Sequence, residues 1–280
     1  MGLNMSKPFT NEQLNNLVKQ TLLANKVIFV WYFHFDFKNA TAKEHAARGL
    51  CQRLITMRAN VMNIFDAYRP GREGIPSSKE MVDLTINFQS FIFHLYGCLD
   101  NLAWIWASES GFEYKRPSEI TFSLNKNGSV LLKTLSDDFQ QFWKSKSRII
   151  KHIENFRHAL AHRIPLYVPP YIPKEGHIEE CNQINEEMQQ ASLKYDLELF
   201  DKLLKKLEKI AFFEPICAHS VLENSQMVSV WLECISGLDF ISTICKKISE
   251  EIRNRDNTDT TELDKKISAM LEDKSLFNIV

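Results

Sequence analysis

The sequence predicts an all-α protein: an up-and-down helical bundle with a small β-hairpin insertion and extra helices near its termini. Three observations lead to this fold class. Apolar residues recur at steps of three and four along most of the chain, as they do on one face of a helix. Capping residues and prolines bound these stretches. Hydrophobic residues make up 44% of the 280 residues and charged residues 25%, which suffices for a sizeable core.

The N-terminal residues 1–40 are expected to decorate a bundle that spans residues 41–253. Residues 11–24 have the apolar spacing of a short amphipathic helix. Residues 27–37 are rich in β-branched and aromatic side chains, a composition that strands and buried helices share. The sequence leaves both structures open for that segment.

Two long helices are expected next, joined by a short polar loop. The first begins at Thr41, which forms a capping-box pattern with Glu44, and it ends at Arg69-Pro70-Gly71. The second follows Pro76-Ser77-Ser78. The apolar positions of the two helices are Ala47, Leu50, Leu54, Met57, Val61, Ile64 and Tyr68, then Leu84, Phe88, Phe91, Leu95, Leu99, Leu102 and Trp106. Such a pair is typical of an antiparallel bundle.

A β-hairpin is expected at about residues 118–133, because Asn127-Gly128 separates two short apolar runs. Ser136 is the expected N-cap of a third helix, with a break near residues 145–147.

The remaining segments alternate between polar and helical patterns. Residues 165–190 contain four prolines and are predicted to be a Pro-rich loop. Helices resume at Tyr195, and a last long helix has apolar positions from Met227 to Ile252. Residues 254–280 are expected to form a polar tail with a weakly amphipathic segment at 263–271.

Bulk composition excludes several classes of protein. The formal net charge of −1 gives no general signature of nucleic-acid binding. The six cysteines form no Cys-x-x-Cys pair, which disfavours a zinc knuckle and a disulfide scaffold. Residues 1–10 lack a signal-peptide pattern, and no apolar run reaches the roughly 20 residues that span a bilayer. We therefore expect a cytoplasmic protein without membrane contact, metal or cofactor.

The end of the third helix carries the most chemically suggestive residues. Arg157, His158 and His162 fall just before Pro165, which ends the helix. Between residues 144 and 163, six Lys or Arg residues oppose only Glu154. Arg can bind phosphate oxygens, and His can move the proton of a ribose 2′-hydroxyl. The pattern therefore fits RNA cleavage without a metal.

This motif, Arg157-His158-Ala159-Leu160-Ala161-His162 late in a helical bundle, resembles the signature of the HEPN superfamily. The run that follows, Arg163-Ile164-Pro165-Leu166-Tyr167-Val168-Pro169-Pro170, is similar to a bacterial branch of it. The resemblance implies a homodimer formed through the motif-bearing helix, with both motifs in a shared cleft. It implies a metal-independent endoribonuclease that leaves 2′,3′-cyclic phosphate ends, in a toxin-antitoxin or anti-phage setting. RNA is the implied substrate, and an antitoxin or a nucleotidyltransferase is the implied partner.

Carried over by position, the resemblance makes Arg157 the residue that binds phosphate and stabilises the transition state. It makes His162 the general acid/base and His158 the polar supporter. A subset of these toxins has a tyrosine two residues after the His, where this chain has Ile164. Regulation by modification of that tyrosine is therefore not implied.

Supporting residues are expected around the motif. An acidic residue on a neighbouring helix often orients the motif in such bundles, and Asp100 on the second long helix is the candidate. The basic residues expected to bind substrate are Arg163, Lys151 and Arg148.

Other interpretations fit the same residues. Cations are favourable at a helix C-terminus, so Arg157 and His162 could form a solvated helix end without chemistry. His152, His158 and His162 could be metal ligands, but no thiolate or carboxylate partner accompanies them. His94 is expected to be a hydrogen-bonded core histidine. A non-catalytic module that binds a nucleotide, RNA or a protein stays open, as does a purely structural bundle, and the near-neutral charge favours both.

Overall fold

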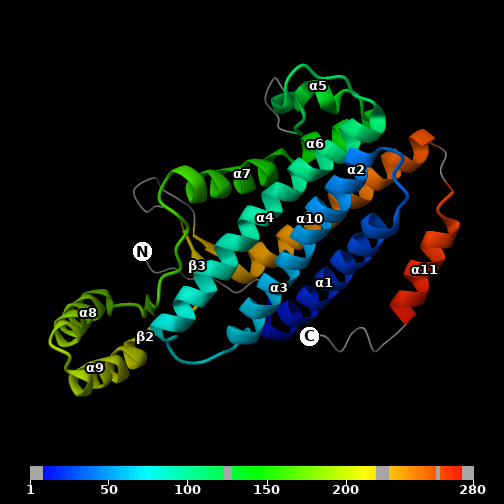
Figure 1. Cartoon of the computed structure of the whole chain (residues 1–280). Coiled ribbons are helices and arrows are strands. Elements are labelled where there is room, and N and C mark those ends of the chain that lie inside the picture. The colour runs from blue at the N-terminus through cyan, green and yellow to red at the C-terminus, as the bar shows by residue number, and fades with distance from the viewer. Residues whose placement is uncertain (1–8, 123–127, 219–226, 257–258, 273–280) are drawn as a thin grey trace.

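The structure, a computed structural model, describes residues 9–122, 128–218, 227–256 and 259–272. Helices make up nearly all of its regular structure (Figure 1), and the strands form two short antiparallel pairs. The predicted all-α fold with a small β-hairpin is therefore confirmed. None of the helices in these ranges has both the length and the apolar character needed to cross a bilayer.

The elements follow one another along the chain with these bounds. The first part holds α1 (Asn11–His34), α2 (Ala40–Glu44), the π-helical turn η1 (His45–Leu50), α3 (Cys51–Ala67), α4 (Ser78–Ser110), the 3-10 turn η2 (Pro117–Glu119), α5 (Gly128–Leu132) and α6 (Asp137–Ser145). The second part holds α7 (Ser147–His162), β1 (Ile172–Pro173), α8 (Ile178–Leu193), α9 (Leu197–Ile210), β2 (Ala211–Phe212), β3 (Ile216–Cys217), β4 (Val228–Ser229), α10 (Val230–Asp256) and α11 (Thr261–Glu272).

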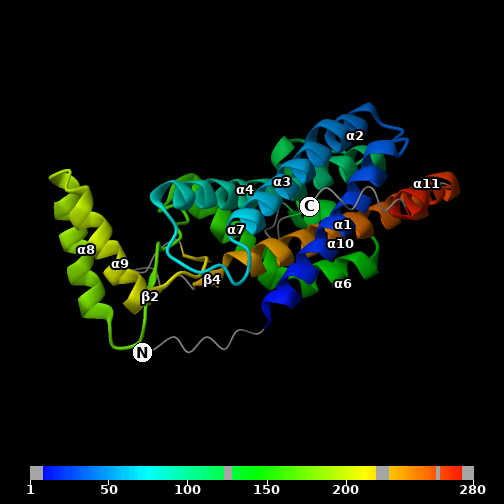
Figure 2. The same ribbon diagram turned by 90° about the horizontal axis from the view of Figure 1, so that it is seen from below.

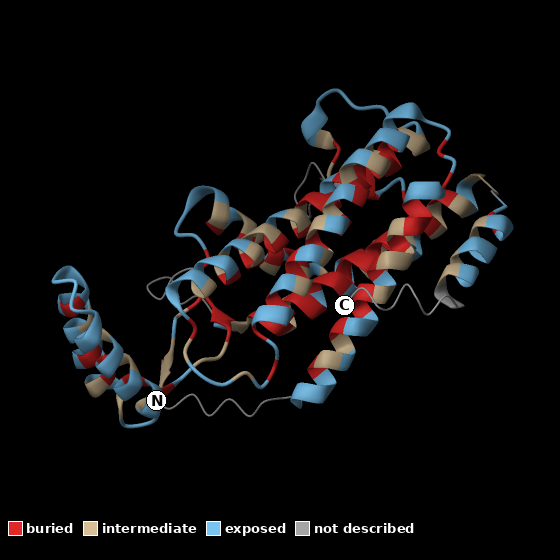
Figure 3. Cartoon of the chain, turned by 60° about the horizontal axis from the view of Figure 1, so that its bottom comes forward, coloured by how far each residue is buried: buried red, intermediate tan, exposed pale blue. Residues whose placement is uncertain are grey.

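The main core lies where the long helices α1, α3, α4 and α10 face one another. The α4 helix packs against α3, α7 and α10, and α1 packs against α3 and α10. Figure 3 shows the buried residues gathered along these inner faces. Leu54, Phe91 and Ile241, one from each of α3, α4 and α10, are all 0% exposed. The bundle is therefore held together by apolar side chains from distant parts of the sequence.

The α1 helix is part of this core rather than a decoration on it. Val18, Trp31 and Tyr32 are buried in the main cluster. The Tyr32 hydroxyl donates to the backbone carbonyl of Cys245 on α10, at 2.8 Å. The helix also continues without a break through residues 27–34, so that segment is helical and not a strand. Burial against α10 decides this, since local composition could not.

The expected start of the first long helix at Thr41 is wrong. Asn39 is the N-cap, and its side-chain Oδ1 accepts from the backbone N–H of Thr41 at 2.8 Å and of Ala42 at 3.4 Å. Asn caps helices at least as well as Thr, and it stands two residues earlier. The Glu44 side chain instead approaches Arg48, at 3.8 Å.

The other two helix starts are found where the sequence places them. The α4 helix begins after Ser77, which forms a capping box with Glu80. Ser136 caps α6, its side chain accepting from the backbone N–H of Phe139. The break expected near residues 145–147 is confirmed, because α6 ends at Ser145 and α7 begins at Ser147.

The described part of the predicted hairpin at residues 118–133 contains no strand. Residues 128–132 form the helix α5, and residues 123–127 of the predicted hairpin lie outside the described ranges. Leu131, Leu132 and Leu135 are buried in the main core, so tertiary packing overrides the local turn signal. The strand pairs are instead β1 with β2 and β3 with β4.

The Pro-rich loop predicted for residues 165–190 is wrong in its second half, where α8 begins at Ile178. The α8 and α9 helices pair and project from the bundle (Figures 1 and 2). This α8–α9 hairpin has a small core of its own, formed by Cys181, Ile184, Leu203, Leu207 and Ala211. The apolar stripe of α8 is narrow, so the sequence alone did not indicate a helix there. The helix is evident only in the structure, where it packs against α9.

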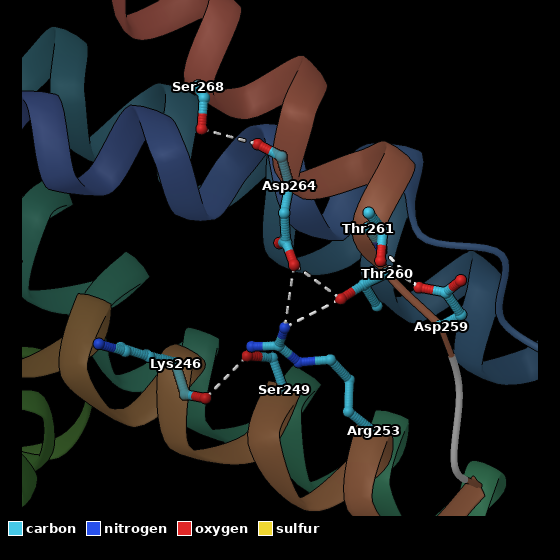
Figure 4. A network of polar contacts seen from close by, with 8 residues as sticks. All are labelled: Lys246, Ser249, Arg253, Asp259, Thr260, Thr261, Asp264 and Ser268. Carbon is cyan, nitrogen blue, oxygen red and sulfur yellow. Dashed lines mark hydrogen bonds and ion pairs between the residues drawn. The ribbon is translucent and has the colours of Figure 1, made fainter.

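The polar tail expected after residue 254 contains α11, which packs against α1. Its start is joined to the end of α10 by a polar network (Figure 4). One Arg253 nitrogen donates to the Thr260 hydroxyl at 3.0 Å, and that hydroxyl donates to Asp264 at 2.8 Å. Leu263 and Ile267 pack against the main core, so the weak amphipathic pattern of this segment does mark a helix.

Candidate functional site

The motif lies at the exposed C-terminal end of α7. Ile150, Ile153, Phe156 and Ala159 are buried, and their spacing of three residues turns one side of α7 towards the bundle. The opposite side carries His158 and His162, which are exposed, while Arg157 is half-buried. The motif is therefore open to solvent and not sealed under other helices.

The helix ends directly after the motif. The backbone N–H of Arg163 donates to the carbonyl of Ala159 at 3.1 Å, and Arg163 then leaves helical geometry with φ −133° and ψ −153°. A residue close before Pro165 cannot continue the helix easily, because the proline ring crowds the preceding backbone. The sequence therefore sets the position of His162 in the last turn of α7.

Arg157 is directed towards α4. Its guanidinium carbon lies 5.4 Å from the centre of the Tyr96 ring, in the range of a cation–π contact. Burial raises the pKa of the Tyr96 hydroxyl, and Asp100 and Glu154 raise it further, while Arg157 lowers it. Tyr96 thus holds the guanidinium next to two carboxylates.

Asp100 lies one turn after Tyr96 on α4, as the sequence places it. Its side chain is exposed, yet the surrounding helices displace enough water to raise the pKa of its carboxyl above the usual value. Arg53 and Arg157 act in the opposite direction and lower that pKa. Asp100 is therefore near enough to Arg53 on α3 and Arg157 on α7 for both charges to act on it, although it forms an ion pair with neither.

The two histidines of the motif share one side of α7. Their ring centres are 6.1 Å apart. In an ideal helix, Arg157 and His162 point about 140° apart, and His158 lies between them at about 100° from Arg157. A phosphodiester that touched both the guanidinium and the His162 imidazole would pass over the His158 ring.

The three basic residues expected to bind substrate are spread along α7. Arg163 is exposed beside His162, and Lys151 is exposed about 9 Å before Arg157 along the helix axis. Arg148 lies about 14 Å before Arg157 and lines a separate pocket against α10. The structure thus groups Arg163 with the motif and separates Arg148 from it.

A polar network on the other side of α4 was not foreseen from the sequence. Arg53 on α3 donates through Nε to the Oδ1 of Asn101, at 2.9 Å, and its NH1 lies 3.3 Å from the Nδ1 of His94. The Nδ2 of Asn101 lies 3.2 Å from the Nδ1 of His45, in the π-helical turn. The His45 ring stacks on Trp104, with ring centres 5.0 Å apart and planes 2° from parallel. His94 is thus hydrogen-bonded, as expected, but on a half-buried face shared with Arg53.

Two glycines make room for this network. A Cβ at Gly97 would overlap the guanidinium of Arg53, and a Cβ at Gly49 would overlap the side-chain amide of Asn101. A helix-interior glycine costs about 0.5–1 kcal/mol relative to alanine. Because of that cost, a glycine inside the long apolar α4 indicates that another group comes close there. Gly97 is therefore the residue from which the sequence could have predicted the network.

The histidines of this network favour their neutral forms. Burial lowers the pKa of His94, and Arg53 lowers it further. Burial also lowers the pKa of His45, against an opposing effect of Glu44. A neutral imidazole can accept on Nδ1, which matches the donors that Arg53 and Asn101 present.

Other chemistries have little support in the structure. All six cysteines are reduced and buried. Burial raises the pKa of each thiol, that of Cys51 to about 12, so none is an activated nucleophile. Among the described residues, no three His, Cys, Asp or Glu side chains are grouped as metal ligands would be.

Searches of protein-family models, curated proteins and solved structures find nothing that matches the chain. A function must therefore be inferred from the residues of α3, α4 and α7 themselves.

Proposed function

We propose that this chain is a metal-independent endoribonuclease of the HEPN type, acting through Arg157 and His162. The observation that supports this most is the end of α7. There an arginine, held against α4 by Tyr96, and two exposed histidines lie within six residues. The setting would then be a toxin-antitoxin or anti-phage system, as the resemblance implies.

The proposed reaction needs a proton acceptor, an anion clamp and a proton donor. The His162 imidazole takes the proton of the ribose 2′-hydroxyl as that oxygen attacks the adjacent phosphorus in line. Arg157 binds the phosphate oxygens, whose negative charge grows in the transition state. The bond to the 5′-oxygen breaks, and that oxygen takes a proton from the imidazole of a second copy. The products are a 2′,3′-cyclic phosphate and a 5′-hydroxyl.

An exposed apolar surface beside the motif supports the homodimer in this proposal. Val82, Ile86 and Phe93 lie on one side of α4 and are 57%, 59% and 49% exposed. Gln89, on the same helix, donates to the carbonyl of Leu166 at 2.6 Å, which ties the segment after α7 to α4. That segment adds the exposed side chains Ile164 and Tyr167. Several large apolar side chains exposed near one another are typical of protein interfaces.

The test is cleavage of labelled single-stranded RNA in the presence of a chelator. The wild-type chain should leave 2′,3′-cyclic phosphate ends. His162→Ala and Arg157→Ala should each lower the rate by about 10²–10⁴ with unchanged helical content.

Two matched controls come from elsewhere in the chain. His34 is also an exposed histidine in the last turn of a helix, and Arg48 is an exposed helical arginine. His34→Ala and Arg48→Ala should keep full activity. The proposal is wrong if the motif variants cleave as fast as these controls, or if the wild-type chain does not cleave RNA.

The second candidate is a non-catalytic module that binds RNA, a nucleotide or a protein at the same place. The exposed apolar stripe on α4 favours it, since such a surface also suits a protein partner. RNA binding that Arg157→Ala weakens, with no product from the wild-type chain, would select this candidate.

A further inference from the structure

A pocket separate from the motif opens between α4, α7 and α10. Its volume is about 370 Å³, within the roughly 300–1,000 Å³ of pockets that hold small organic ligands. It lies at the N-terminal end of α7, whereas the motif lies at the C-terminal end. What occupies it is therefore a question independent of RNA cleavage.

One wall of the pocket is basic. Arg148 and Lys146 line it. Arg148 is exposed and has no hydrogen-bond or ion-pair partner among the described residues, while the Lys146 ammonium lies 5.6 Å from the Phe142 ring centre. This wall is also the first turn of α7, which has no capping side chain. The positive end of the helix adds to the attraction for an anion.

A histidine–glutamate pair also lines the pocket: His152 lies one turn after Arg148 on α7, and Glu233 lies on α10. The Nε2 of His152 on α7 lies 3.0 Å from Oε2 of Glu233 on α10. The two side chains are only 32% and 18% exposed, and the His152 ring also packs on Phe156, with ring centres 4.3 Å apart. The Glu233 carboxylate has this one hydrogen-bond partner among the described residues. A half-buried carboxylate with spare acceptor capacity favours a ligand that brings hydroxyl or amino donors.

The floor between these walls is apolar. Leu95, Ile149, Ile153 and Val228 line it, and Gly237 lies beside them. The Ser236 hydroxyl at the edge donates to the Leu232 carbonyl of its own helix, at 2.7 Å. The face of a flat ring would thus rest on aliphatic side chains.

We propose that this pocket binds a nucleoside monophosphate. Its phosphate lies against Arg148 and Lys146, its ribose hydroxyls donate to Glu233, and its base rests on the aliphatic floor. Each group of the ligand would contact a matching part of the lining. The phosphate would contact the two cations, the ribose hydroxyls the Glu233 carboxylate, and the base the aliphatic side chains.

The test is calorimetric titration of the full-length protein with AMP, adenosine and inorganic phosphate at constant ionic strength. AMP should bind the wild-type chain with a Kd of about 10 μM to 1 mM. Adenosine should bind at least about ten-fold more weakly, because it lacks the phosphate that Arg148 contacts. AMP should also bind more tightly than phosphate, which cannot use Glu233 or the floor.

The variants assign the binding to this pocket. Arg148→Ala should weaken AMP binding about ten-fold, and Glu233→Gln should weaken AMP but not phosphate. Lys144→Ala removes an exposed positive charge nearby that does not line the pocket, and it should bind AMP as the wild type does. Arg148 is exposed, so its variant tests the proposal even if Glu233→Gln fails to fold.

Three results would overturn the proposal: no AMP binding by the wild-type chain, equal binding of AMP by Arg148→Ala and Lys144→Ala, or loss of AMP binding in Arg157→Ala alone. The last result would place the nucleotide at the motif. The titration does not depend on RNA cleavage, so its result stays interpretable even if the endoribonuclease proposal fails.

Discussion

At the scale of single residues, the Tyr96 ring can set the position of the Arg157 guanidinium. It is the aromatic ring against which the guanidinium rests, and it also lies beside Asp100. If the endoribonuclease proposal is right, Tyr96→Leu should lower kcat about two- to five-fold, because the cation–π contact that positions Arg157 is lost. Tyr96→Phe keeps the ring and should keep the rate. Equal rates for the two variants, measured beside their melting temperatures, would remove Tyr96 from the site.

His94 makes a residue-scale prediction about pH. Burial and Arg53 lower its pKa in the folded chain, so between about pH 6.5 and that lowered value the unfolded chain binds a proton that the folded chain does not. The free energy of unfolding should therefore fall as pH drops below about 6.5. His94→Gln removes this contribution, and its urea midpoint should change less between about pH 7.5 and about pH 5.5 than that of the wild type. The exposed His34→Gln should keep the full dependence.

The sequence was informative about single residues where a residue acts through the chain next to it. His162 stands at a helix end because Pro165 follows closely, and both facts are visible in the sequence. Arg53 reaches Asn101 and His94 across an interhelical contact with residues more than 40 positions away. In the sequence, nothing distinguishes Arg53 from the other polar residues of an amphipathic helix. Such a role depends on the packing of α3 against α4, which no local pattern specifies.

At the scale of elements, Gly97 leaves room for the Arg53 guanidinium where α3 packs against α4. Gly97→Ala should destabilise the protein by about 1–3 kcal/mol, because the new methyl overlaps the Arg53 guanidinium. In an Arg53→Ala background the overlap disappears, and the same change should be neutral or stabilising by up to about 1 kcal/mol, the gain in helix propensity. A double-mutant cycle of urea unfolding measures the difference. An equal cost in both backgrounds would contradict the role assigned to Gly97.

The α8–α9 hairpin should unfold separately from the bundle. Leu207→Ala creates a cavity in its small core and should cost it about 2–5 kcal/mol, while the main core is untouched. Hydrogen exchange should then speed up in α8 and α9 and stay slow in α4 and α10. Leu54→Ala, at a fully buried site of the main core, is the matched control and should speed exchange throughout. Uniform acceleration in Leu207→Ala would show that the two cores are one cooperative unit.

Prediction of the elements succeeded where caps and apolar spacing agree. The starts of α4 and α6 have both signals. Local signals near residues 128–132 and 178–193 were misleading: an Asn-Gly turn at the start of the first segment and a Pro-rich run at 165–173 before the second. Their helical structure comes from burial against partners distant in sequence, the main core for α5 and α9 for α8.

At the scale of the whole molecule, the proposed dimer makes a direct prediction. Phe93→Asp puts a charge into the exposed apolar stripe on α4 and should convert a dimer into a monomer, because an unpaired charge is costly in an apolar interface. Sedimentation measures the mass. Ile178→Asp changes an exposed apolar residue on the α8–α9 hairpin and should leave the dimer intact. A wild-type chain that sediments as a monomer at assay concentrations would end the shared-cleft form of the proposal.

The whole-molecule architecture was predictable as a class but not in its layout. Apolar spacing over long stretches indicated a helical bundle, and the structure is one. Apolar spacing could not show that α1 packs along α10, since that pairing joins residues more than 200 positions apart, such as Tyr32 and Cys245. Nor could the spacing show that α7 carries the motif at its C-terminal end and lines a pocket at its N-terminal end.

The state of the sulfur atoms has a practical consequence for following this molecule in solution. Since every native thiol is enclosed and hard to ionise, a cysteine engineered on the surface becomes the fastest site for maleimide or methanethiosulfonate reagents. A nitroxide attached at position 144 of the natural background would therefore report spin–spin distances between two copies, without first stripping the chain of its own cysteines.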